Sequence, residues 1–131
     1  MAGHAEGTLV ERMGIRFTEA SRTRVVATMP VEGNTQPYGL LHGGAHLVLA
    51  ETLGSMSAAY LAGPDHIVVG IEIGATHVRG VRSGLVTGTA EAIHVGRTLI
   101  SHEIKMTDEE GKLLSTVRMT NLVRTKPPAA T

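Results

Sequence analysis

The sequence contains no cysteine among its 131 residues. This absence excludes disulfide bonds, thiol nucleophiles and every metal site that depends on cysteine ligands. Aromatic residues make up only 2% of the chain and tryptophan is absent, so a ligand pocket would be lined by aliphatic, methionine and small side chains. An excess of one charge is also missing, because twelve basic residues balance twelve acidic ones. We therefore expect no general attraction to nucleic acid or to a membrane surface.

Targeting and membrane-spanning segments are not predicted either. The first eight residues lack the basic start and apolar core of a secretory leader, so we expect no signal peptide and a cytoplasmic protein. The apolar run from about residue 43 to residue 62 approaches the length of a membrane span. It contains His46, Glu51, several glycines and three hydroxyl side chains, which make lipid a poor environment. We interpret this run as a helix enclosed by protein, within a single domain of residues 1–131.

Periodicity along the chain predicts one short helix, one long helix and about six strands. The predicted elements are a helix at residues 8–13, two strands within 15–29, a loop at 30–39, a helix at about 43–62, and strands at 66–78, 84–95, 97–107 and 112–123. Gly63 and Pro64 end the long helix, and the tail from about residue 126 to residue 131 is expected to be disordered. One helix against a mostly antiparallel sheet is an α+β architecture, and the small residues of the helix would let a curved sheet approach closely.

The long predicted helix carries a single acid, Glu51. Every other position from residue 47 to residue 62 is apolar, glycine or hydroxyl-bearing. A lone carboxylate on such a helix is costly to bury and is seldom kept without a use. Ser55 follows one turn later on the same face, so a hydroxyl and a carboxylate can hold one water molecule between them. Glu51 is therefore a candidate catalytic residue, and the alternative is an exposed acid or one paired with an arginine.

A polar loop enters this helix through His42, Gly43 and Gly44. The two glycines leave the first N–H groups sterically open at the positive end of the helix dipole. Such an end polarises a carbonyl oxygen or binds an anion, although the plainer interpretation is a permissive turn. His42 is a candidate general acid, a positioning donor or a core histidine. With Gln36 just upstream and Glu51 two turns into the helix, this is one arrangement that attacks an acyl carbonyl.

Two later segments combine basic residues with turn glycines. That composition suits phosphate groups, although charges at strand ends are commonly solvated and protect sheet edges. The basic residues concerned are His77, Arg79, Arg82, His94 and Arg97.

No metal site is predicted. His42 and His46 are four residues apart, but no glutamate follows His42 in the metalloprotease pattern and no third ligand is placed by the sequence. The serine-hydrolase elbow and the glycine patterns of nucleotide-binding loops are also missing.

The run from Asn34 to Gly44, followed by Leu49-Ala-Glu51-Thr-Leu-Gly-Ser55, resembles the hotdog-fold acyl-CoA thioesterases. The resemblance is to the PaaI-like group, within it the enterobactin-proofreading and 1,4-dihydroxy-2-naphthoyl-CoA thioesterases. Segments 76–79 and 111–118 resemble that group as well. The resemblance implies a long central helix wrapped by a six-stranded antiparallel sheet. It also implies dimers with a continuous sheet, usually paired into a tetramer, and active sites at the dimer interface.

The same resemblance implies roles for individual residues. Glu51 would be the nucleophile or general base, and the Gly43 N–H would polarise the thioester carbonyl. Gln36 would help to hold that carbonyl, His42 would lie near the sulfur or carbonyl, and Ser55 would help to place the water. No cofactor would be needed, because coenzyme A is part of the substrate. The candidates for contact with the CoA phosphates are His77, Arg79, Arg82, His94, Arg97 and Thr98.

The expected function is therefore hydrolysis of an acyl-CoA or aryl-CoA thioester to the free acid and CoA. Two other functions stay open. One is a non-catalytic module that binds acyl-CoA and leaves the thioester intact. The other is a dehydratase of hydroxyacyl thioesters, which would want an Asp–His pair where this helix offers Glu51. Benzoyl, dihydroxynaphthoyl, phenylacetyl and medium-chain acyl groups are all compatible with the sequence.

Overall fold

A computed structural model describes residues 5–128 of the chain. Its elements are α1 (Leu9–Arg12), β1 (Arg16–Ala20), β2 (Val25–Pro30), α2 (Gly43–Ala62), β3 (His66–His77), β4 (Leu85–Val95), β5 (Leu99–Thr107) and β6 (Leu113–Thr125). The predicted α+β class and order of elements are confirmed, and the ends of the helices and of β3–β6 lie within two residues of the predicted ends. Residues 126–128, in the tail that was expected to be disordered, have no regular secondary structure. The rest of that tail, residues 129–131, and residues 1–4, at the end where no signal peptide was expected, lie outside the described residues.

Local signals fix both ends of α2. His42 is extended, with φ −65° and ψ 132°, and its Nδ1 accepts the N–H of Gly44 at 2.8 Å, which caps the helix. At the other end Gly63 has φ +88°, a left-handed conformation that glycine adopts without strain. The Gly63 N–H donates to the Ala59 carbonyl at 3.1 Å, and Pro64 follows. No helix within residues 5–128 has both the length and the apolar character that crossing a membrane requires.

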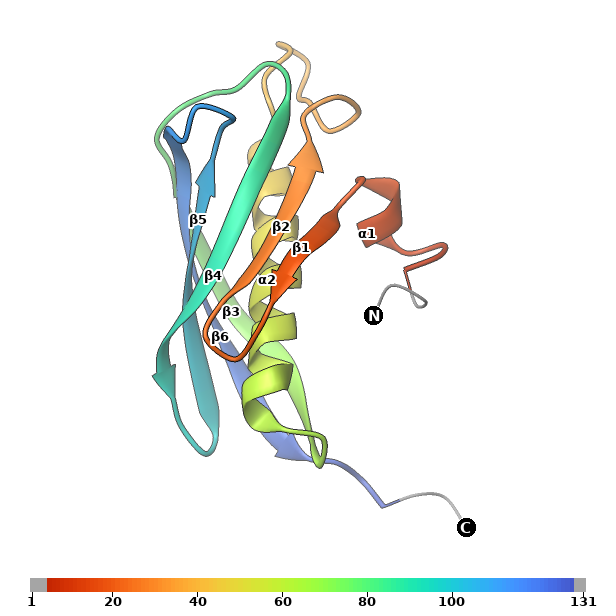
Figure 1. Ribbon diagram of the computed structural model, residues 1–131, viewed down its shortest axis with the longest axis vertical. Coiled ribbons are helices and arrows are strands. Elements are labelled where there is room, and N and C mark those ends of the chain that lie inside the picture. Colours follow the sequence, from red (N-terminus) through yellow and green to blue (C-terminus); the bar gives the residue numbers. More distant parts are fainter. Residues whose placement is uncertain (1–4, 129–131) are drawn as a thin grey trace.

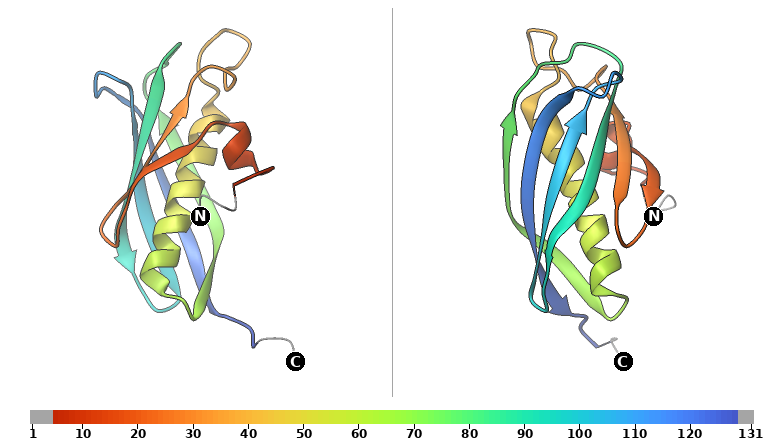
Figure 2. Two further views of the ribbon diagram at one scale, coloured as in Figure 1. Left: turned by 45° about the vertical axis from the view of Figure 1, so that its right-hand side comes forward. Right: turned by 60° about the vertical axis from the view of Figure 1, so that its left-hand side comes forward.

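The six strands form one sheet in the order β1-β2-β4-β5-β6-β3. Every neighbouring pair is antiparallel. The sheet curves around one side of α2, and β3 runs beside the helix at the end of the sheet (Figures 1 and 2). β3 pairs with β6 along its whole length, from His66 opposite Thr125 to His77 opposite Ser115, and no strand within residues 5–128 pairs with its other edge.

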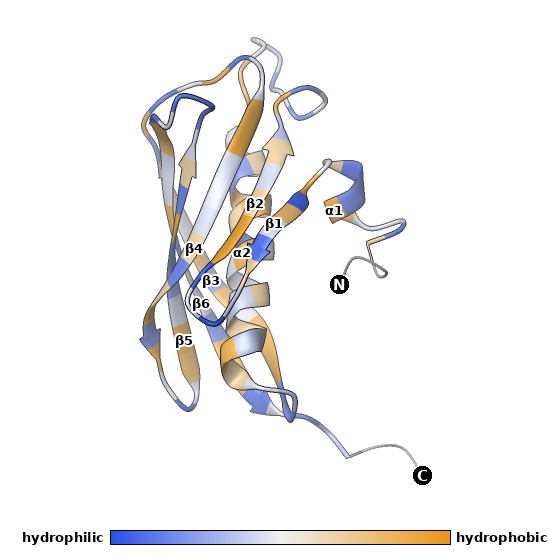
Figure 3. Cartoon of the chain, in the orientation of Figure 1, coloured by the Kyte–Doolittle hydropathy of each residue, from blue (hydrophilic) through white to orange (hydrophobic). Residues whose placement is uncertain are grey.

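The core lies between α2 and the concave face of the sheet. On α2 it contains Leu49, Ala50 and Leu53, none of which is exposed to solvent. Figure 3 shows apolar residues on α2 and on the neighbouring strand β2. Burying a side chain such as leucine stabilises a fold by about 1.5–3 kcal/mol. A glycine of the helix allows the close approach predicted from the sequence, because a Cβ at Gly54 of α2 would lie 2.9 Å from the Met119 Cγ of β6.

Residues 5–128 leave part of the side of α2 that faces away from the sheet uncovered, and Ala59 and Tyr60 are exposed there. Glu51 lies on this side and is exposed. The sequence-based picture of a carboxylate buried at high cost therefore does not hold within one chain, because the sheet covers only one side of the helix. The neighbouring β3 also exposes apolar side chains, with Val69 46% and Ile71 56% accessible. A free edge of this kind is a template for pairing with another strand.

Candidate active site

A cavity of about 350 Å³ opens at the N-terminal end of α2. The loop before the helix, its first turn and the segment that follows β3 form its walls. The lining residues are Gln36, Leu40, Leu41, Gly43, His46, His77, Val78, Arg79, Gly80 and Val81. The structure therefore brings together four residues that were predicted to act on the substrate or to bind it. They are Gln36, Gly43, His77 and Arg79.

Two hydrogen-bond donors face this cavity from the loop and the start of α2. The side-chain oxygen of Gln36 accepts the main-chain N–H groups of Tyr38 and Leu40, so the amide nitrogen is the group available to a ligand. Gly43 occupies the first position of α2, where a helix has no internal acceptor for the N–H. No acceptor among the described residues takes this N–H. The positive end of the helix dipole thus presents an open donor beside Gln36.

His77 lies against the start of α2. A Cβ at Gly43 would come within 2.8 Å of the His77 Nε2, so a glycine at this position makes room for the imidazole. The register of β3 with β6 places His77 opposite Ser115, and the His77 Nδ1 lies 2.8 Å from the Ser115 Oγ. The Ser115 hydroxyl donates to the Thr76 carbonyl at 3.3 Å. Ser115 therefore accepts from the His77 Nδ1–H, and the Nε2 at the other end of the ring lies toward Gly43.

His46 packs on the face of this imidazole. The two rings stack with centroids 5.1 Å apart and an interplanar angle of 29°. His46 is only 3% exposed, and its Nδ1 is buried without a hydrogen-bond partner among the described residues. Burial lowers the pKa of His46 to about 4, and the neighbouring His77 adds to the lowering. From the sequence, His46 was considered only as a possible metal ligand together with His42, because no local pattern indicates that β3 brings His77 beside it.

His42 does not line this cavity. Its ring is exposed and caps α2 through the Gly44 N–H, which excludes the interpretation as a core histidine. Within residues 5–128, no three potential metal-ligating side chains gather at one point.

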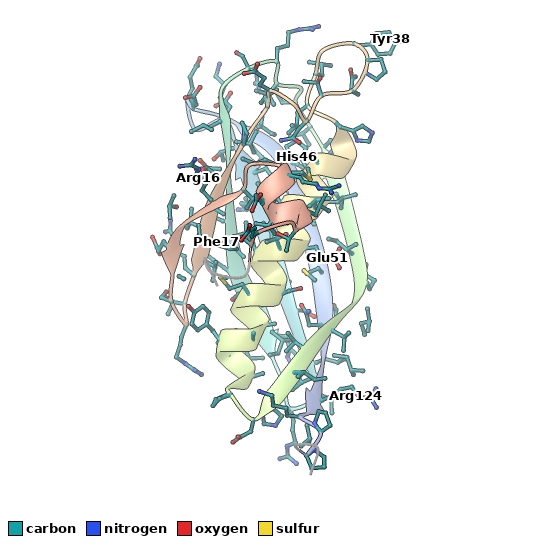
Figure 4. The ribbon with its side chains drawn as sticks, turned by 90° about the vertical axis from the view of Figure 1, so that its right-hand side faces the viewer. Arg16, Phe17, Tyr38, His46, Glu51 and Arg124 are labelled. Carbon is teal, nitrogen blue, oxygen red and sulfur yellow. The ribbon has the colours of Figure 1, made fainter. Side chains whose placement is uncertain are left out.

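Glu51 lies further along α2 than His46, on the side toward β3 (Figure 4). Gly43 and Glu51 are eight residues apart, which is about 12 Å along a helix axis. A reacting carbonyl needs its oxygen within hydrogen-bond distance of the amide and its carbon about 3–3.5 Å from the attacking group. One chain therefore does not bring Gly43 and Glu51 to the same carbonyl.

The surroundings of Glu51 form a second group of site residues. One carboxylate oxygen lies against the main chain of β3, where a Cβ at Gly70 would be 3.0 Å from the Glu51 Oε2. One turn later the Ser55 Oγ accepts from the Asn121 Nδ2 at 3.4 Å. A second cavity, of about 530 Å³, lies on the same side of α2. Its mostly apolar lining consists of Thr52, Ser55, Met56, Ala59 and Tyr60.

The basic residues predicted to meet phosphates fall into two separate groups. Arg79 lines the first cavity, and the Arg82 guanidinium donates to the Tyr38 carbonyl at 3.0 Å, which ties the two loops together. The residues of the second group lie in or beside the turn between β4 and β5 at the opposite end of the sheet, and they are His94, Arg97 and Thr98. The Thr98 carbonyl accepts from Val123, which pairs with Val68 of β3. Val68 is about 30 Å from His77 along the strand, so one chain does not unite the two groups.

Comparison with known proteins identifies the family. Residues 38–115 match the model of the thioesterase superfamily. The chain is 49% identical over 119 residues to the proofreading thioesterase EntH of Cronobacter turicensis, covering 89% of this chain and 86% of that protein. It is 45% identical over 119 residues to the 1,4-dihydroxy-2-naphthoyl-CoA hydrolase of Listeria monocytogenes, covering 90% and 97%.

A solved structure gives the same result. A mutant of the thioesterase PA1618 from Pseudomonas aeruginosa matches with a TM-score of 0.92 and 38% identity, covering 95% of this chain and 91% of that one. The predicted resemblance to hotdog-fold thioesterases is confirmed, and with it the prediction of an enzyme that hydrolyses thioesters. The chain belongs to the thioesterase superfamily, and its fold is the hotdog fold.

Proposed function

We propose that this protein hydrolyses an acyl-CoA or aryl-CoA thioester to the free acid and CoA. In this proposal the Gly43 N–H of one chain polarises the carbonyl, and Glu51 of a second copy is the nucleophile or general base. The observation that carries the proposal is the division of the site: a chain offers an open amide donor at one level of α2 and an exposed carboxylate about 12 Å away.

A second copy paired antiparallel along the free edge of β3 closes this gap. The level of Gly43 is marked by its contact with His77, and the level of Glu51 by its contact with Gly70. Gly70 and His77 lie equally far along β3 from the midpoint between Ile73 and Gly74. A two-fold axis at that midpoint sets the His77 level of one chain opposite the Gly70 level of the other. The same axis brings the end of the sheet that carries Arg79 in one chain next to the end that carries Arg97 in the other. The two groups of basic residues therefore come together across the dimer.

The chemistry then needs only groups that the two chains supply. The thioester oxygen accepts from the Gly43 N–H and from the Gln36 amide at the positive end of the helix dipole, which stabilises the negative charge that develops on it. The Glu51 carboxylate either attacks the carbonyl carbon or takes a proton from a water that Ser55 helps to hold. Both routes expel the CoA thiolate and consume one water, and the products are the acid and CoA.

The two cavities fit the two parts of such a substrate. The apolar cavity beside Ser55 suits an acyl or aryl group. The cavity at the start of α2 holds the donors and Arg79, and it suits the thioester and the chain that leads to the CoA phosphates. The dimer of dimers, the cytoplasmic location, the placement of His42 near the sulfur and the absence of a cofactor stay predictions.

Substituting Glu51→Gln tests the proposal, because glutamine keeps the shape of the side chain and removes the charge. We expect kcat to fall by about 10²–10⁴-fold in an assay of thiol release across a panel of benzoyl, naphthoyl, phenylacetyl and medium-chain CoA esters. Full turnover by Glu51→Gln would contradict the proposed mechanism. Binding without thiol release by the unsubstituted protein would favour the binding module, and hydration of an enoyl-CoA would favour the dehydratase.

A second pair of variants isolates the amide donor. Gly43→Pro removes the N–H, and proline is well tolerated at the first position of a helix. Gly43→Ala keeps the N–H and adds the same contact with His77, so it is the matched control. We expect Gly43→Pro to be about 10²–10³-fold slower than Gly43→Ala, the usual cost of losing one such donor. Equal rates would exclude the Gly43 N–H from catalysis.

A further inference from the structure

We propose that Gly70 and Asn121 are positioning residues that hold Glu51 and Ser55 in their working places. The inference rests on the proposed function, in which Glu51 and Ser55 act on the thioester and its water. Gly70 of β3 lies directly opposite Asn121 of β6 in the register of the sheet. Glu51 contacts the Gly70 side of this pair and Ser55 contacts the Asn121 side. One rung of the sheet therefore supports two site residues that are one turn apart on α2.

Gly70 acts because it has no side chain, which leaves room for the Glu51 carboxylate beside β3. An added Cβ would lie 3.0 Å from the Glu51 Oε2 and 3.4 Å from the terminal carbon of Met119, which is itself buried. The carboxylate is the end of a flexible side chain, so it moves more easily than the packed methionine. A methyl group at this position is therefore expected to displace the carboxylate and leave the core in place. The register of β3 also shifts between Gly70 and Glu72, and such irregularities commonly re-aim side chains near active sites.

Asn121 acts through a single hydrogen bond to Ser55, and the other polar atom of its side chain has no hydrogen-bond partner among the described residues. The residue is completely buried, and its Oδ1 has no hydrogen-bond partner among the described residues. Its Nδ2 donates to the Ser55 Oγ at 3.4 Å, and no other hydrogen bond of this side chain is present among those residues. This bond uses one of the two lone pairs of the Ser55 oxygen and orients the hydroxyl, whose hydrogen can donate toward a water or toward Glu51. A buried amide with an unpaired oxygen lowers stability, so a role in the site explains its presence.

The test of Gly70 uses a control on the same strand. Gly74→Ala adds the same methyl group to β3, but its nearest neighbour is the Glu72 Oε1 at an ordinary 3.7 Å. Both glycines lie on β3, the strand that forms the proposed dimer contact, so dimer formation is checked by sedimentation for both variants. We expect Gly70→Ala to lower kcat by about 10–100-fold with little change in KM, because misplacement by about 1 Å costs up to about 100-fold. Gly74→Ala should stay within about twofold of the parent protein, since its methyl group meets no site residue.

Shortening the acid provides the rescue experiment. Glu51→Asp withdraws the carboxylate by one methylene, so the added methyl group at position 70 no longer meets it. In the Glu51→Asp background, Gly70→Ala should therefore change the single-turnover rate by less than about threefold, a non-additive result of the kind that contacting residues give. The same loss in both backgrounds would overturn the assignment of Gly70. So would a Gly70→Ala protein that behaves like Gly74→Ala.

The test of Asn121 combines activity with stability. Asn121→Val removes the unpaired oxygen, so we expect the urea midpoint to stay the same or rise while kcat falls by about 3–10-fold, the usual worth of one hydrogen bond. In a Ser55→Ala background the same substitution should leave kcat unchanged. An equal loss with and without Ser55, or a fall in the urea midpoint that accompanies the loss of activity, would overturn the role of Asn121. These results are separate from the proposed function, which fails if Glu51→Gln keeps full turnover.

Discussion

Buried His46 makes the stability of the fold depend on pH in a predictable direction. The pKa of histidine in an unfolded chain is about 6.5, and burial against His77 lowers the pKa of His46 in the folded chain to about 4. Between these values the unfolded chain binds a proton that the folded chain excludes, so the free energy of unfolding rises with pH. The contribution is fully present above about pH 6.5 and is lost as the pH falls to about 4. A difference of about 2.5 pKa units corresponds to about 3 kcal/mol, a large part of the roughly 5–15 kcal/mol typical of a domain.

Urea unfolding between pH 4 and pH 8 measures this effect when the protomer concentration is held constant. His46→Phe keeps a ring to stack on His77 and removes the titrating group. Between pH 8 and pH 4 the free energy of unfolding of this variant should therefore fall by about 3 kcal/mol less than that of the parent protein. Burial also lowers the pKa of His102, which adds a slope of the same sign to both proteins. An unaltered slope in His46→Phe, or stability that increases toward acid pH, would refute the reasoning.

Three further predictions concern packing, the His77 contact and the phosphates. Gly88→Ala should lower the free energy of unfolding by about 1–3 kcal/mol in urea titrations, because the new methyl group would lie 2.6 Å from a leucine methyl of α2. Ser115→Ala removes the partner of the His77 Nδ1 and should lower kcat/KM by about 3–10-fold, while a loss below twofold would contradict a role for this contact. Arg79→Ala and Arg97→Ala should each raise KM for CoA esters by about 5–30-fold. The KM for a pantetheine thioester, which lacks the nucleotide phosphates, should not change. Equal effects on both substrates would exclude phosphate contacts.

Features that depend on local sequence were predictable. The ends of α2 follow from the glycines at its two ends, which act within one turn, whereas the cap at His42 was found only in the structure. The later strands follow from alternation of side chains, and their ends lie within two residues of the predicted ones. Gln36 and Gly43 were identified as site residues because the loop and the helix start are adjacent in the sequence.

Features that depend on the pairing of distant strands were not predictable. The contact of His77 with Ser115 and its stacking on His46 require the register of β3 with β6, and a shift of one residue would turn His77 to the other face of the sheet. The positions of Gly70 and Asn121 beneath α2 have the same origin. The exposure of Glu51 was only an alternative in the sequence analysis, because periodicity shows that a helix is apolar and does not show which side of it is left uncovered.

Mixing two inactive variants is the most direct test of a site shared between two chains. Glu51→Gln lacks the acid and Gly43→Pro lacks the amide donor, so each alone should be inactive. His42 already has φ −65° and ψ 132°, a conformation that a following proline accepts. In a hybrid dimer one of the two sites combines the intact Gly43 of one chain with the intact Glu51 of the other. Equal co-expression with two affinity tags should therefore restore about one quarter of the parent activity in the unfractionated mixture, and about one half in purified hybrids. Purified hybrids that are no more active than either variant alone would contradict the shared site.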